Sequence, residues 1–296
     1  MSRLKITHLT EYRFFSPVTL QPHRLLLRPR EGPEIHIESS SLEIFPTCHI
    51  KWQRDALDNA AAVIDFQESA QTLSINSEVI LQLSDKSPLD FLVADYAVNY
   101  PFHYAPHDRV DLQPFLQPAY LDEAESIRNW LNQLGLGQPV MQTYGLLDQL
   151  SRTIAGQFAY TVRDEPGVQS PAQTLAWGSG SCRDFAALFV ETCRYLGLAS
   201  RFVSGYAHTP DTEYWSTTTH AWAEVYLPGG GWRGFDPTTG LAVTDRHVVL
   251  AEAADAALAA PTHGSIRGTG ARMELRANVT LTELATNEQS ATENKQ

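Results

Sequence analysis

Apolar and polar residues alternate along the first part of the chain, a pattern typical of half-buried β-strands. In the opening segment the alternating positions are Leu4, Ile6, His8, Thr10 and Tyr12. The alternation returns over residues 35–43, and β-rich runs follow over residues 62–66 and 72–83, with prolines and glycines between the segments. The pattern predicts an all-β domain over residues 1–85, built as a small antiparallel sandwich.

The second half of the chain carries helical periodicity and then more strands. Residues 124–134 and 141–154 predict two helices, and residues 181–196 predict a third with a continuous apolar stripe. The stripe consists of Phe185, Leu188, Phe189, Cys193 and Leu196, and Gly197 stands where a glycine commonly ends a helix. Strand-like segments follow at 200–206, 220–227, 232–235 and 273–284. This mixture predicts an α+β domain over residues 120–284.

Two segments fit neither pattern. Residues 86–119 are rich in prolines and aromatics. We expect an ordered connector there that packs on both halves, since a free linker would carry fewer aromatics. Residues 285–296 are polar and predict a disordered tail.

Composition places the chain among ordinary globular proteins and excludes some partners. Of its 296 residues, 43% are hydrophobic and 19% charged, which is enough for a sizeable core. The formal net charge of −12 at pH 7 repels phosphate backbones and anionic lipids, so we expect neither nucleic acid nor a membrane as a partner. The N-terminus lacks a secretory pattern. Three cysteines without paired spacing indicate free thiols, so we expect a cytoplasmic protein.

Cys182 has the position of an activated nucleophile. It lies where the loop G-S-G-S turns into the helix predicted from residue 181, off the apolar stripe. A helix start presents unpaired N–H groups and about half a positive charge, which favours a thiolate and can receive a developing oxyanion. Cys48 and Cys193 lie within apolar patterns, so we interpret both as structural.

A base and an orienting carboxylate follow on the next predicted strands. His220 opens a strand, and histidine is the side chain best suited to take a thiol proton near neutral pH. Asp236 comes one strand later, where a carboxylate can accept the second imidazole N–H. Alone, the histidine is a surface residue and the aspartate begins a turn. The presence of Cys182 favours the catalytic interpretation.

The turn between these two strands decides whether His220 and Asp236 meet. A loop of four residues over 228–231 would pair Ala223 with Asp236 and place Asp236 on the face opposite His220. A loop of three or five residues, or a bulge, returns both side chains to one face. We therefore predict such an irregularity in this hairpin.

Three segments together resemble the core motifs of the bacterial transglutaminase-like superfamily of cysteine proteases, namely G-S-G-S-C-R-D-F-A, H-A-W-A-E-V-Y-L-P-G-G-G-W and F-D-P-T. The opening, KITHLTEYRFFSPVTLQPHRLLLRPR, resembles the β-sandwich domain that precedes this core. The resemblance spans roughly residues 3–282. It implies a papain-like core with Cys182 on a helix and with His220 and Asp236 on neighbouring strands. The chain departs from many relatives after Asp245–Ala251, where an alanine-rich stretch replaces a basic and aromatic run bordering the site.

Chemistry and resemblance together predict a cysteine-dependent amide or peptide-bond hydrolase or acyltransferase that acts on a peptide or protein amide through a thioester. Water as the acceptor gives a protease or amidase, which the family analogy favours, whereas a lysine amine gives protein cross-linking. The second oxyanion donor stays open among Trp177, Trp215 and Tyr160, beside the Cys182 backbone N–H. No cofactor or metal is expected, because neither a phosphate loop nor a calcium-binding pattern is present.

Two other interpretations remain open. The first is a metal site built on His103 and His107, with His208 or His220 as a further ligand, although Pro101 and Pro106 argue against a helix there. The second is a non-catalytic scaffold or binding module that keeps the fold. The oligomeric state and the scissile bond are not fixed by the sequence.

Overall fold

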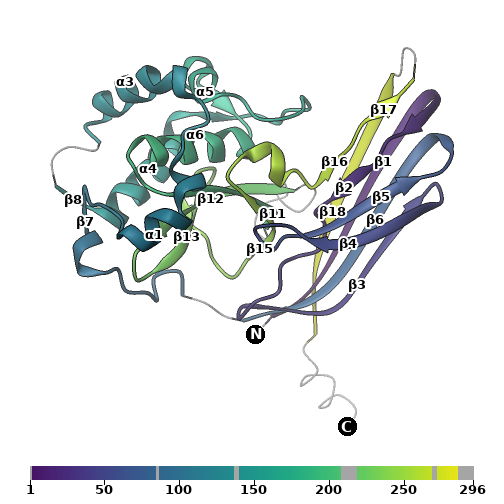
Figure 1. Ribbon diagram of the computed structural model, residues 1–296, viewed down its shortest axis with the longest axis horizontal. Helices are drawn as coiled ribbons and strands as arrows, with labels where there is room; N and C mark the ends of the chain where they lie inside the picture. The colour runs from purple at the N-terminus through teal and green to yellow at the C-terminus, as the bar shows by residue number, and fades with distance from the viewer. Residues whose placement is uncertain (1, 85–86, 137–139, 208–218, 269–271, 286–296) are drawn as a thin grey trace, which may run out of the picture.

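The computed structural model describes residues 2–84, 87–136, 140–207, 219–268 and 272–285. Figure 1 shows its two parts side by side, a helical part on the left and a set of long strands on the right. His208, Trp215 and the tail from residue 286 lie outside the described residues. In the described ranges, none of the helices is long and apolar enough to cross a membrane.

The long strands form the predicted antiparallel sandwich of two sheets. The first sheet contains β1 (Ser2–Leu20), β3 (Ile35–Phe45), β6 (Ser69–Leu83), β17 (Ile266–Arg267) and β18 (Met273–Leu284). The second contains β2 (His23–Leu25), β4 (Cys48–Arg54), β5 (Ala60–Phe66) and β16 (Thr262–His263). Phe14 and Leu73 from the first sheet and Leu25 and Ile64 from the second are buried in one cluster, so the sheets pack face to face.

The last strands of the chain join the sandwich and not the core sheet. Residues 262–284 were expected in the α+β domain, but β16 pairs with β2, and β17 and β18 pair with β1. The pairing of β18 with β1 runs from Arg3 opposite Leu284 to Phe14 opposite Met273. The alternating pattern of β18 predicts a strand but does not name its partner, and β1 offers an unpaired edge along its length.

The second part is built on an antiparallel sheet of five strands in the order β14-β13-β12-β11-β15. Their bounds are β11 (Ser200–Ala207), β12 (His220–Leu227), β13 (Gly231–Asp236), β14 (Leu241–Ala242) and β15 (His247–Ala253). The main helices are α3 (Ala124–Leu134), α4 (Thr143–Gln157), α5 (Pro171–Trp177) and α6 (Cys182–Tyr195). Phe185 and Phe189 of α6 pack with Ala223 and Val225 of β12 in the largest buried cluster. The predicted α+β core is present.

Short elements fill the remaining described segments. The connector contains η1 (Asp95–Ala97), β7 (Asn99–Tyr100), α1 (Pro106–Asp111), α2 (Gln113–Leu116) and η2 (Leu121–Glu123). β7 pairs with β8 (Met141–Gln142), β9 (Ala159–Tyr160) pairs with β10 (Ser179–Gly180), and η3 (Ala256–Ala259) follows β15. The Tyr104 hydroxyl donates to the Tyr226 carbonyl at 2.9 Å and accepts from the Ala199 N–H at 2.9 Å, so the connector is held against the core sheet.

Helix α6, which carries Cys182, begins and ends where the sequence predicts. Asp184 accepts hydrogen bonds from both the backbone N–H and the hydroxyl of Ser181, at 2.7 and 2.8 Å, and this fixes the first turn. Gly197, with a φ of 76°, ends the helix in the left-handed region. Almost every side chain between these residues is buried, so α6 is the central helix of the core.

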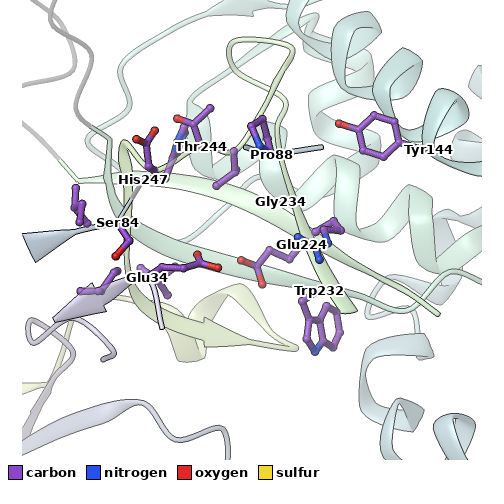
Figure 2. Close-up of a pocket in the computed structure, with 15 residues that line it drawn as sticks. Glu34, Ser84, Pro88, Tyr144, Glu224, Trp232, Gly234, Thr244 and His247 are labelled. Carbon is purple, nitrogen blue, oxygen red and sulfur yellow. Dashed lines mark hydrogen bonds between the residues drawn. The ribbon is translucent and has the colours of Figure 1, made fainter. Parts of the chain in front are cut away.

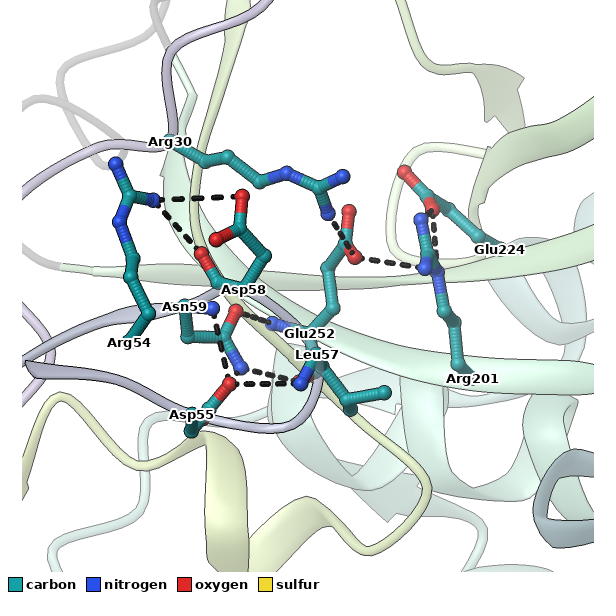
Figure 3. A network of polar contacts seen from close by, with 9 residues as sticks. All are labelled: Arg30, Arg54, Asp55, Leu57, Asp58, Asn59, Arg201, Glu224 and Glu252. Atoms are coloured by element: carbon teal, nitrogen blue, oxygen red, sulfur yellow. Dashed lines mark hydrogen bonds and ion pairs between the residues drawn. The ribbon is translucent and has the colours of Figure 1, made fainter.

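A chain of charged groups joins the two parts (Figure 3). Glu252 on β15 accepts from Arg30 of the sandwich and from Arg201 of β11, each at 2.7 Å. Arg201 also pairs with Glu224 at 2.6 Å. The Asn59 side chain bonds both the N–H and the carbonyl of Glu252, at 2.9 and 2.8 Å. Strand β15 is thereby fixed to the sandwich through side chains and backbone alike.

Candidate active site

Cys182 is the first residue of α6 and has only 7% of its surface exposed. Its backbone N–H belongs to the helix turn whose donors have no partner within the helix. The Tyr160 hydroxyl, from the short strand β9, lies near the Cys182 side chain. Burial together with the charge of Cys182 raises the pKa of Tyr160 to about 12, so this tyrosine stays a hydrogen-bond donor at neutral pH.

His220 and Asp236 meet because the hairpin between their strands has three loop residues. Leu227 pairs with Gly231 and Ala223 with Phe235, so residues 228–230 form the loop and Asp236 falls opposite Trp222. Trp222 and His220 are two residues apart and share a face of β12. The predicted irregularity is confirmed, and the Nε2 atom of His220 lies 2.9 Å from Oδ2 of Asp236.

His220 and Asp236 are both buried, and each stabilises the charged form of the other. Burial opposes a proton on His220, but the Asp236 charge, the hydrogen bond to Asp236 and the nearby Cys182 side chain outweigh it and raise the pKa of His220 to about 10. Burial likewise opposes the Asp236 carboxylate. The charge and hydrogen bond of His220, with His247 behind it, nevertheless hold the pKa of Asp236 well below its usual range.

The structure thus brings all three predicted site residues together. With Nε2 of His220 bonded to Asp236, Nδ1 is the ring nitrogen that remains to exchange a proton with the thiol. The second oxygen of Asp236 accepts the Thr238 N–H at 2.9 Å, which fixes the carboxylate plane. This arrangement can form a thiolate, stabilise an adjacent imidazolium and deliver a proton to a leaving group.

Asp184 bonds the loop before α5 to helix α6. This carboxylate, fully buried, accepts from Arg163 at 2.6 Å and from the Gln169 N–H at 2.7 Å. Arg183, next to Cys182, donates to the carbonyls of Arg163 and Glu165 at 3.0 and 3.2 Å. The two residues that follow Cys182 therefore hold the segment 163–169 beside the helix start.

His247 is a neighbour of the site that the sequence did not identify as a site residue. Its Nε2 lies 3.7 Å from the same Oδ2 of Asp236 that His220 contacts. Its ring packs edge-on against Trp222, with centroids 5.2 Å apart. The one signal was its place in the stretch Asp245–Ala251, directly before the run that the family resemblance locates at the border of the site.

Within the described residues, one group of side chains has the spacing of a metal site: His220, Asp236 and His247, with ligand atoms within 4.8 Å of one another. The 2.9 Å hydrogen bond between two of the three accounts for their proximity. His103 and His107 do not form such a group in this part of the chain. A helix does start at Pro106, against expectation, because proline suits a first helical position, but His103 precedes it.

A small cavity of about 100 Å³ lies between the sandwich and the core sheet. Figure 2 shows His247 and Thr244 at one end of it and Trp232 at the other, with Glu34 and Ser84 contributed by the sandwich. Cys182, His220 and Asp236 are not among the described residues that line it. The cavity is therefore next to His247, which contacts Asp236, and is not lined by Cys182.

Two regions of the chain match models of known protein families. Residues 4–82 match the bacterial transglutaminase-like N-terminal region, and residues 135–237, which contain Cys182, His220 and Asp236, match the transglutaminase-like superfamily. The chain belongs to this superfamily and carries the family's bacterial N-terminal region in front of the core.

Similar proteins extend over nearly the whole chain. The uncharacterized protein Rv2569c of Mycobacterium tuberculosis is 29% identical over 282 residues, which cover 89% of this chain and 87% of the relative. The uncharacterized protein ML0607 of Mycobacterium leprae is 24% identical and covers 96% of this chain and all of the relative, 100%. The crystal structure of a "putative cysteine protease" from Cytophaga hutchinsonii has a TM-score of 0.75 at 22% identity and covers 97% of this chain and 92% of its own. At that identity the likeness shows the fold.

Proposed function

We propose that the protein is a cysteine-dependent amide or peptide-bond hydrolase or acyltransferase, with Cys182 as nucleophile, His220 as base and Asp236 as orienter. The observation that carries the proposal is the buried hydrogen bond of 2.9 Å between His220 and Asp236, next to a cysteine at the start of a buried helix. A charged pair costs free energy to bury, so its presence beside a thiol is better explained by chemistry than by stability alone.

The reaction starts from a thiolate and an imidazolium. The Cys182 sulfur attacks the carbonyl carbon of an amide, and the oxyanion forms beside the N–H groups at the start of α6. His220 then gives its proton to the leaving amine as the C–N bond breaks, and a thioester remains on Cys182. Asp236 holds the imidazole in position and stabilises its positive charge throughout.

The second half-reaction depends on the acceptor. Neutral His220 takes a proton from water, the resulting hydroxide attacks the thioester, and the acid leaves as thiolate and imidazolium are restored. Hydrolysis of a peptide or isopeptide bond is the preferred outcome, by analogy with the family and with the putative cysteine protease of the same fold. A lysine amine in place of water would make the protein a cross-linking transglutaminase.

The test is the rate at which iodoacetamide alkylates Cys182 as a function of pH, followed by mass spectrometry. Cys48 and Cys193 are internal controls, because burial raises the pKa of both thiols. We expect Cys182 to react well below pH 8, faster than the other two, and to lose this advantage in His220→Ala. Peptide amides and glutamine donors would then identify the acceptor.

The opposite result would favour the non-catalytic scaffold. If Cys182 in the folded protein reacts only near pH 8.5, as an ordinary thiol does, or not at all, the proposed chemistry is wrong. Binding of peptides without turnover would then be the activity to measure.

A further inference from the structure

We propose that His247 is a positioning residue of the active site, which holds the Asp236 carboxylate from behind and thereby orients His220. The inference rests on the proposed function, since it adds a fourth residue to the same site. Its geometric basis is the Oδ2 atom of Asp236, which lies 2.9 Å from His220 Nε2 and 3.7 Å from His247 Nε2.

A tight turn over residues 244–247 determines which ring nitrogen of His247 carries the proton. The Thr244 N–H donates to Nδ1 of His247 at 3.3 Å, and the His247 N–H donates back to the Thr244 carbonyl at 3.1 Å. Because Nδ1 accepts a hydrogen bond, the ring proton of the neutral imidazole sits on Nε2. That N–H is buried and faces the Asp236 carboxylate.

The ring has little freedom to leave this place. Its side chain is 10% exposed, and the indole of Trp222 packs edge-on against it with centroids 5.2 Å apart. The His220 ring lies close by, at 6.2 Å between centroids. Contact with Asp236 at 3.7 Å is longer than a full hydrogen bond, and contacts of this kind commonly tighten when substrate is bound.

His247 is also held by the sandwich. It is the first residue of β15, and two residues further on the Val249 carbonyl accepts the Arg30 N–H at 3.2 Å. Three residues later, Glu252 is bonded through its backbone to Asn59 and through its side chain to Arg30. The N-terminal domain thus contributes to the site by fixing the strand that supports Asp236.

Two near-isosteric substitutions separate the two nitrogens of His247. In His247→Gln the side-chain amide can take the place of Nε2 and donate to Asp236. In His247→Asn the amide oxygen can take the place of Nδ1 and accept from Thr244, but nothing reaches Asp236. The readout is the alkylation rate of Cys182 by iodoacetamide from pH 5 to 9, with Cys48 as the control and urea unfolding to verify the fold.

We expect His247→Asn to slow alkylation of Cys182 at pH 6.5 on the order of tenfold, as for the loss of one hydrogen bond to a charged group, and to move the rise in rate to higher pH. His247→Gln should keep most of the wild-type rate, and Cys48 should not change. Equal rates in both variants, whether slowed or unchanged, would overturn the role assigned to Nε2. If wild-type Cys182 itself lacks reactivity below pH 8, the proposed function fails first and the inference falls with it.

Discussion

The imidazole of His220 and the carboxylate of Asp236 form a hydrogen bond of 2.9 Å, although each side chain is only 2% exposed. Water contributes little to either charge at this depth, so each depends on the other for stabilisation. The pair is therefore the element of the site whose removal should be visible in stability as well as in activity.

The first prediction concerns the pH dependence of stability. The folded-state pKa of His220 is raised from 6.5 to about 10, so its contribution is fully present below pH 6.5 and is lost as the pH rises through about 10. His220 by itself should therefore lower the free energy of unfolding between pH 6.5 and 9.5 by at most about 1.4 kcal/mol per pH unit, and the fall should be steepest above about pH 8.5, where the cysteine thiols of the unfolded chain have also lost their protons. In Asp236→Asn this fall should largely disappear. Urea unfolding at pH 6.5, 8 and 9.5 measures it, and parallel profiles for the two proteins would contradict it.

The second prediction assigns the Tyr160 hydroxyl to the oxyanion. The hydroxyl lies near Cys182 and keeps its proton at neutral pH, because burial and the Cys182 charge raise the pKa of Tyr160 to about 12. Tyr160→Phe should lower kcat for a peptide amide about 10²-fold, the loss typical of one oxyanion donor, with little change in KM. Alkylation by iodoacetamide forms no oxyanion, so its rate should change little. If both rates fall together, the hydroxyl acts on the thiolate and not on the oxyanion.

The third prediction concerns Asp184, whose carboxylate joins the loop 163–169 to α6. Burial opposes its charge, but hydrogen bonds from Gln169, Ser181 and Arg163 outweigh this and lower the pKa of Asp184. Asp184→Asn removes the buried anion of Arg163 and leaves only the exposed Glu165 at 3.6 Å, so the free energy of unfolding should fall by about 3 kcal/mol. Asp164→Asn, an exposed neighbour, is the matched control and should stay within about 0.5 kcal/mol. Equal effects in urea unfolding would mean that the buried pair contributes nothing.

The fourth prediction uses two glycines with opposite surroundings. A Cβ at Gly205 would overlap the Val248 backbone oxygen and the Trp222 ring, so Gly205→Ala should destabilise the fold by about 3 kcal/mol and displace the strand that carries His247. A Cβ at Gly156, in α4, meets nothing within 4 Å, and Gly156→Ala should stabilise the protein by about 0.5–1 kcal/mol. Thermal unfolding of both variants checks the signs, and a stable Gly205→Ala would show that β11 and β15 can move apart.

Local sequence patterns were enough to predict helix α6 and the irregular loop between β12 and β13. The apolar stripe from Phe185 to Leu196 has the helical period, and Ser181 and Gly197 mark the two ends. The requirement that His220 and Asp236 share a face of the sheet was enough to predict an irregular loop, because side chains alternate along strands.

The same local patterns did not predict which strands pair when they lie far apart in the sequence. The bounds of β18 were predicted, but its partner β1 lies at the opposite end of the chain, and alternation gives a period without naming a neighbour. His247 contacts Asp236 although β12 and β11 lie between their strands, β15 and β13, in the order of the sheet. Only the three-dimensional arrangement of the sheet brings a second histidine to that carboxylate.

The pairing of β1 with β18 affects the order in which the protein can assemble during synthesis. On a ribosome, β1 emerges first and meets β6 early, but its other long neighbour is made only after the whole α+β core has been translated. Until then β1 has an open edge that could pair with another chain. The nascent protein therefore completes its first domain last, and a chain cut before Met273 would keep that edge exposed permanently.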